Sequence, residues 1–190
     1  MNLYVSFEEL QLFGGKEGAE EAQRVYPLLK SWVEGQNSRQ AVWHAGQVVR
    51  AALLLPKDTL RDFYAVALYH AALAFWVYGM IRKRKNGGVD PEFGNGIEGE
   101  YVILDGPDTE EVRQFIANSR GTPVLRGPRH QDGTPQNNLV RLEQPKAVME
   151  VVIAILKGNC SAGNAGLLPA LIENLAQLVR DLGNAARIMG

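Results

Sequence analysis

The chain has 190 residues, of which 46% are hydrophobic and 22% charged, and its formal net charge is -1 at pH 7. This length fits one domain with a sizeable core, and the balanced charge argues against a domain that binds a nucleic-acid backbone by itself. The one cysteine, Cys160, excludes an internal disulfide framework and a cysteine-rich zinc site, and it favours a reduced intracellular protein.

Apolar residues at helical spacing predict two helices near the N-terminus, after a short helix or turn that ends at Phe13. In the first of the two, within residues 19–35, Pro27 should kink the helix or mark its true start. Gly35 is a plausible end for it. The second should be capped by Asn37 or Ser38 and end at Pro56. Its apolar stripe comprises Val42, Ala45, Val49, Ala52 and Leu53.

The next segment, residues 57–85, predicts a long helix with Asp58 as its cap. It is apolar nearly all round, which is typical of a helix surrounded by other helices. Residues 63–81 approach the length of a membrane span. Because the segment carries His70, Gly79 and tyrosines, it is only moderately hydrophobic, and we expect a buried central helix in preference to a transmembrane one.

The second half alternates long polar loops with helices. Residues 86–100 and 122–138 predict loops, and "YVILDG" between them reads as an extended piece too isolated for a sheet. Between the extended piece and the second loop we expect a helix. It should start at a capping-box-like pair, Asp108 and Glu111, and end at Gly121. Another should begin at Pro145.

The last predicted helix has a core stripe of Leu168, Leu171, Leu175, Leu178 and Leu182. The expected fold is therefore all-α: an irregular bundle of about six helices around a hydrophobic central helix, with two long polar loops.

No residue pattern predicts catalysis, a metal site or a cofactor. His44, His70 and His130 lack the spacing of metal-ligand pairs, and each acidic residue considered has a structural explanation. "GNGIEG", residues 94–99, has no preceding strand to make it a phosphate loop. We therefore expect a protein that is not an enzyme.

"SRQAVWHAGQVVRAALLLP" raises the question of whether Trp43, His44 and Arg50 serve chemistry or packing. Helical pitch puts Trp43, Gly46 and Arg50 on one face, which predicts a tight helix crossing at Gly46. Arg50 could pair with an acid such as Asp62. The alternative is a small-molecule-binding protein, with or without enzymatic activity, whose pocket lies between the helices of Trp43 and Trp76 and is lined by His44, Tyr69, His70 and Trp76. The six candidate ligand-binding residues are then Trp43, His44, Arg50, Tyr69, His70 and Trp76.

A compact basic run, Arg82, Lys83, Arg84 and Lys85, ends the central helix. The simplest interpretation is a solvated helix end where cations favour the helix dipole. A nuclear import signal or a phosphate contact is the functional alternative.

Four stretches together resemble a known family. "SRQAVWHAGQVVRAALLLP", "LRDFYAVALYHAALAFWVYG", "YVILDGPDTEEVRQFIANSRGTPVL" and "LLPALIENLAQLVRDLGNAA" are similar to the C-terminal part of the fungal-specific transcription factor domain. The version with C2H2 zinc fingers is the most similar.

The resemblance implies one helical regulatory domain over residues 1–190, the C-terminal part of a longer domain, which acts in transcription regulation in the nucleus. It implies a protein partner or self-association, a surface that responds to a partner or small molecule, and no membrane. DNA would be bound only through a zinc-finger module that this chain lacks.

Overall fold

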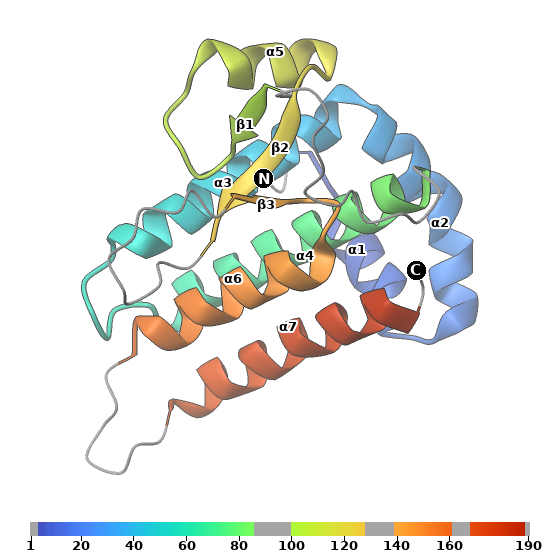
Figure 1. Ribbon diagram of the computed structural model, residues 1–190. Helices are drawn as coiled ribbons and strands as arrows, with labels where there is room; N and C mark the ends of the chain where they lie inside the picture. The colour runs from blue at the N-terminus through green and yellow to red at the C-terminus, as the bar shows by residue number, and fades with distance from the viewer. Residues whose placement is uncertain (1–3, 86–99, 128–138, 161–167, 189–190) are drawn as a thin grey trace.

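The computed structural model describes residues 4–85, 100–127, 139–160 and 168–188, with side chains described as far as residue 185 in the last segment. Over these residues the chain forms seven helices and one three-stranded sheet (Figure 1). The elements in chain order are α1 (Phe7–Phe13), α2 (Ala19–Glu34), α3 (Gln36–Leu54), α4 (Asp62–Lys85), β1 (Tyr101–Ile103), α5 (Glu110–Asn118), β2 (Thr122–Arg126), β3 (Leu139–Arg141), α6 (Pro145–Gly158) and α7 (Ala170–Ile188).

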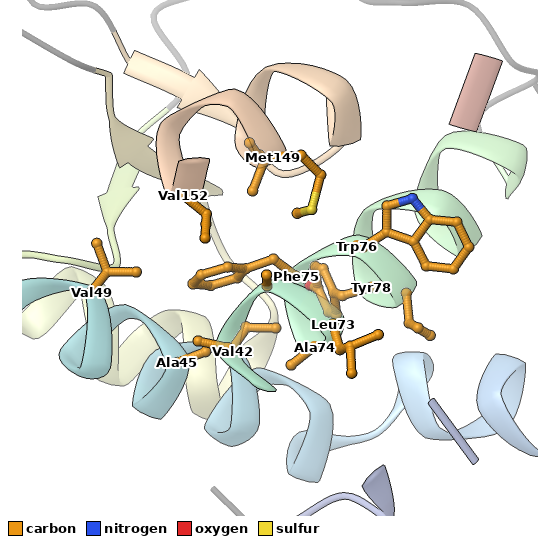
Figure 2. Close-up of a cluster of buried hydrophobic side chains, with 14 of the residues drawn as sticks. Val42, Ala45, Val49, Leu73, Ala74, Phe75, Trp76, Tyr78, Met149 and Val152 are labelled. Carbon is orange, nitrogen blue, oxygen red and sulfur yellow. The ribbon is translucent and has the colours of Figure 1, made fainter. Parts of the chain in front are cut away.

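The prediction of a mostly helical bundle is confirmed, and α4 runs through its middle (Figure 1). Every residue from Ala71 to Ile81 is buried, because helices α1, α3, α6 and α7 contact α4 from different sides. Figure 2 shows Phe75 between Val42 of α3 and Val152 of α6, while Trp76 points toward a different part of the core. A helix that is apolar all round therefore has neighbours all round.

By length and composition, α4 could also cross a membrane, and it is the one helix among the described residues that passes this test. In its most apolar 18-residue window, 72% of the residues are buried inside the structure. The buried central position matches the expectation from the sequence.

Several predicted helix ends are wrong. Helix α3 begins at Gln36, and the hydroxyl of Ser38 donates to the carbonyls of Val33 and Gly35 instead of capping α3. Helix α4 begins at Asp62, since Asp58 lies in the turn before it with a φ of 64°. In α2, Pro27 lies inside the helix and not at its start.

The predicted ends of α5 are also wrong. Its N-cap is Thr109, while Asp108 pairs with Arg113 at 3.2 Å. The helix ends before Gly121, because Ser119 adopts the left-handed conformation that stops it.

The sheet corrects the expectation that "YVILDG" is too isolated to pair. Strand β1 pairs in parallel with β2, and β2 pairs antiparallel with β3, in the order β1-β2-β3. Helix α5 connects the two parallel strands and packs against α3. Residues 122–126, predicted as part of a loop, thus form the central strand. Residues 86–99 and 128–138 of the predicted loops lie outside the described residues.

The buried face of α7 is displaced from the predicted leucine stripe. Ile172, Leu175, Ala176, Val179 and Leu182 are buried, whereas Leu171 and Leu178 are 38% and 47% exposed. Only Leu175 and Leu182 of the five predicted leucines therefore belong to the core, and Ile172, Ala176 and Val179 complete the buried stripe.

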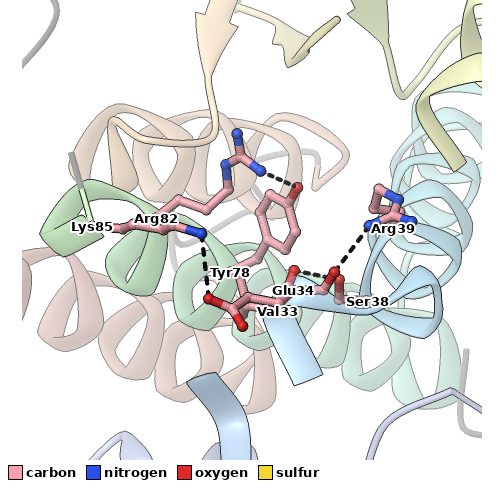
Figure 3. A network of polar contacts seen from close by, with 7 residues as sticks. All are labelled: Val33, Glu34, Ser38, Arg39, Tyr78, Arg82 and Lys85. Atoms are coloured by element: carbon pink, nitrogen blue, oxygen red, sulfur yellow. Dashed lines mark hydrogen bonds and ion pairs between the residues drawn. The ribbon is translucent and has the colours of Figure 1, made fainter. Parts of the chain in front are cut away.

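One buried cation joins two helix ends. The Arg39 side chain is 8% exposed and donates to the carbonyls of Glu34 and Gly35 at the end of α2, and to those of Ile116 and Ala117 at the end of α5. Figure 3 shows it beside Ser38 and Glu34. The last carbonyls of a helix lack partners within the helix and carry partial negative charge, so a guanidinium satisfies both needs.

Candidate functional site

Of the six residues predicted to bind a ligand, the two tryptophans are packed in the core. Trp43 is 8% exposed, and Trp76 is fully buried with its Nε1 donating to the Leu182 carbonyl of α7 at 2.7 Å. The ring of Phe13 lies 5.5 Å from that of Trp76. The indole rings of Trp43 and Trp76 therefore belong to the packing of the core.

The two histidines are half-buried under the N-terminal segment. The His44 ring stacks on Tyr4 at 5.5 Å between centroids, and the His70 ring stacks on Phe7 at 4.3 Å. Tyr69, also half-buried, has its ring 5.9 Å from that of His70. Among the described residues no group of three His, Cys, Asp or Glu side chains could hold a metal ion. His130 lies outside them.

The burial of these histidines predicts a stability that depends on pH. Burial lowers the pKa of His44 and of His70 below the ordinary value of 6.5. The unfolded chain therefore takes up protons first as the pH falls through 6.5, and the free energy of unfolding should decrease there and stay flat above it. We expect a lower urea midpoint at about pH 5 than at about pH 7.

Other groups also titrate in this range, so the comparison is made with the double variant His44→Gln/His70→Gln. Its urea midpoint should change less between the two pH values than that of the unchanged chain. An equal change in both proteins would show that these histidines do not contribute.

Residues of the basic run at the end of α4 contact other parts of the chain (Figure 3). Arg82 donates to the buried carboxylate of Glu143 at 3.1 Å and to the hydroxyl of Tyr78 at 3.3 Å, and Lys85 pairs with Glu34 at 3.3 Å. The guanidinium of Arg84 lies over the Tyr26 ring. A role of Arg82–Lys85 in nuclear import stays a prediction.

Gly46 makes the close approach that the sequence predicts, but its partner is not a helix. A Cβ at Gly46 would lie 2.2 Å from the carbonyl oxygen of Leu104, in the segment that follows β1. Gln47 donates to the carbonyls of Leu104 and Gly106 at 2.8 and 3.0 Å, and Arg50 donates to that of Gly106 at 3.1 Å. Arg50 thus contacts a backbone carbonyl and not the suggested Asp62.

These contacts hold Asp105 at the edge of a cleft of about 640 Å³. The cleft lies between the end of α3, the segment after β1, the end of β2, and α6. Its apolar wall comprises Ala52, Leu53, Leu54, Leu55, Val151, Ala154 and Ile155. Its charged residues are Arg50, Lys57, Asp105 and Arg126. Of the six predicted ligand-binding residues, only Arg50 lines this cleft, and none lines the second cavity of about 480 Å³ beside the end of α4.

The carboxylate of Asp105 is only half-satisfied. Its side chain is 2% exposed, and Oδ1 accepts from the backbone N–H of Arg126 at 3.2 Å. Oδ2 is buried and has no hydrogen-bond partner among the described residues. Buried polar atoms are nearly always paired, so this unpaired oxygen marks Asp105, which lines the cleft, as a candidate contact for a ligand. In the sequence, the one indication that Asp105 belongs to a site is its position directly after the apolar residues "YVIL".

A second surface feature lies at the turn between α3 and α4. Leu53 and Leu54 end α3 and are 56% and 77% exposed, and Phe63 and Tyr64 begin α4 and are 76% and 53% exposed. We call these four residues the apolar corner. Exposed large apolar side chains are a feature of surfaces that contact other proteins, and here the rings of Phe63 and Tyr64 lie 6.0 Å apart.

The chain is similar to a protein of Zymoseptoria tritici named as a transcription factor, with 22% identity over 187 residues. The match covers 93% of this chain and 18% of that protein, so the chain spans less than a fifth of its relative's length. No family model and no solved structure matches the chain. The relative agrees with the resemblance to a transcription factor, while membership of the fungal-specific domain stays a prediction.

Proposed function

We propose that this chain is a non-catalytic regulatory domain of a fungal transcription factor and acts in the nucleus by binding a protein partner or a second copy of itself. The observation that carries the proposal is the similarity to a transcription factor over 93% of the chain. In this proposal DNA is bound by a zinc-finger module outside this chain, as the resemblance implies.

The apolar corner supports an interaction role for the domain. Aromatic residues are enriched in the cores of protein interfaces, where a few large side chains contribute most of the binding energy. Phe63 and Tyr64 expose more than half of their surface although the rest of α4 is largely buried. Burying such rings against a partner gives the domain a contact that needs no catalytic group.

Sedimentation velocity over a concentration series tests the contact. The unchanged chain should associate. The variant Phe63→Ser/Tyr64→Ser should raise the dissociation constant of this association by about 10-fold or more, because two exposed aromatic anchors are removed. Leu178→Ser, which removes an exposed leucine from α7, is the matched control and should leave the association unchanged.

A reporter assay covers the case of a different partner. The chain is fused to a heterologous DNA-binding module, and transcription of a reporter gene is measured in fungal cells. We expect the fusion to change transcription and the double variant to lose most of this effect. A chain that stays monomeric at all concentrations and leaves transcription unchanged would contradict the proposal.

A further inference from the structure

We propose that the cleft beside Asp105 binds a small amphipathic organic anion that also carries a hydrogen-bond donor, such as an N–H or hydroxyl group near its acid group. This site goes beyond the proposed function, and its test does not measure transcription. Because Leu53 and Leu54 belong to both the cleft and the apolar corner, probe binding is measured at chain concentrations where sedimentation shows a monomer. Three properties of the cleft, its charge, its unpaired acceptor and its apolar wall, define the ligand.

The charge favours an anion. Three cationic side chains, Arg50, Lys57 and Arg126, line the cleft against one carboxylate. The exposed guanidinium of Arg126 has no partner among the described residues, and Arg50 uses one of its five donors on the Gly106 carbonyl. Both arginines therefore keep donors for a carboxylate or sulfonate, which guanidinium groups bind with two parallel hydrogen bonds.

The buried oxygen of Asp105 adds the second requirement. Because Oδ2 lacks a partner while Oδ1 is held by the backbone of Arg126, the side chain is fixed with one acceptor unused. A ligand that carries only negative charge would be repelled by it. A ligand with a donor beside its acid group satisfies both Asp105 and the neighbouring arginines.

The apolar wall of the cleft is the third property that defines the ligand. Val151, Ala154 and Ile155 of α6 line the cleft together with Ala52 and Leu53 of α3. A volume of about 640 Å³ lies within the range of small-molecule sites, which combine apolar walls with a few polar groups. This space accommodates a ring system or a short acyl chain.

The probe for the test is 8-anilinonaphthalene-1-sulfonate, which has an apolar body, a sulfonate and an N–H donor. We expect its fluorescence to rise on binding to the full chain. N-phenyl-1-naphthylamine, which has the same body and N–H but no sulfonate, should bind about 10-fold or more weakly, because it lacks the group that the arginines recognise.

Four variants locate the probe. Ala154→Trp fills the cleft from an exposed helix position, and Arg126→Gln removes the unpaired cation; each should weaken probe binding by about 10-fold. Their controls are Ala51→Trp, at an exposed α3 position outside the lining, and Arg120→Gln, at an exposed arginine paired with Glu100. Both controls should bind the probe normally, and urea midpoints verify that all four variants fold.

Asp105→Asn separates the role of the acceptor from simple attraction. This variant loses a negative charge, so charge alone would tighten binding of the sulfonate. We expect weaker binding instead, because an amide presents a donor or a poorer acceptor where the N–H of the probe needs a carboxylate.

Probe binding that is insensitive to Ala154→Trp and Arg126→Gln would overturn the proposal. So would equal affinity for the uncharged analogue, or tighter binding by Asp105→Asn. Loss of binding in Phe63→Ser/Tyr64→Ser, whose residues do not line the cleft, would assign the probe to the apolar corner and also overturn it.

Discussion

Replacing Gly79 by alanine should lower the free energy of unfolding by about 3 kcal/mol or more, at the upper end of what overpacking a core costs. A Cβ at Gly79 would lie 1.9 Å from the carbonyl oxygen of Leu142, between β3 and α6. The obstacle is backbone, so no rotation of a side chain can relieve the clash, and α4 must separate from the start of α6. Urea unfolding followed by tryptophan fluorescence measures the change.

Gly158→Ala is the matched control. Gly158 ends α6, and an added Cβ there meets no atom within 4 Å. Alanine at this position should leave stability unchanged or raise it by about 0.5 kcal/mol, since glycine loses more backbone freedom on folding. Similar stabilities of the two variants would show that α4 does not approach residue 142 as closely as the structure has it.

Replacing Arg39 by methionine should lower the free energy of unfolding by about 3 kcal/mol, because hydrogen bonds to charged groups contribute about 1.5–3 kcal/mol each and the freed carbonyls are partly buried. Methionine keeps much of the apolar stem but donates no hydrogen bond to the ends of α2 and α5. The measurement is the same urea unfolding experiment.

Arg39→Lys separates the charge from the geometry of this residue. Lysine keeps the positive charge but replaces the planar fork, which reaches four carbonyls, with a single ammonium. We expect a loss between zero and that of Arg39→Met. Arg180→Met, at an arginine of α7 that bonds only to the exposed Gln177 among the described residues, should change stability little. If Arg39→Met were equally harmless, the join between the two helix ends would contribute nothing.

Most of the helical fold follows from residue periodicity. The apolar residues of α3 and the uniformly apolar α4 are in the core, because burial of these faces is what the pattern encodes. The ends of α2 and α5, in contrast, are joined by contacts distant in sequence, such as that between Arg39 and Ile116. The periodicity of one segment carries no information about such contacts.

The sheet cannot be predicted from the sequence for a different reason. Its central strand contains Pro123, which is unusual inside a strand because proline cannot donate a hydrogen bond to a neighbour. Here the carbonyl of Pro123 accepts from Leu142 at 3.2 Å, and the strand has only five residues. Strands of three to five residues leave no alternating pattern long enough to detect, and their partners lie in other parts of the sequence.

The cleft could be predicted only in part. Arg50 was singled out from the sequence, but its neighbours Asp105 and Arg126 come from a different supersecondary unit, and only the β1–β2 pairing brings them to α3. Conversely, tryptophans and histidines are few in this chain and therefore stand out as candidate ligand-binding residues. His44, His70 and Trp76 instead contact residues of the N-terminal segment, α1 or α7, and Trp43 is buried in the core.

The position of α4 in the bundle has a consequence for synthesis on the ribosome. Trp76 is anchored to Leu182, 106 residues further along the chain. At about 5–20 residues per second, the ribosome needs about 5–20 s to make the helices that cover this side of α4. During that interval the hydrophobic surface of α4 that α7 later covers is exposed. We expect a chaperone to bind the nascent chain there until the C-terminal helices are made.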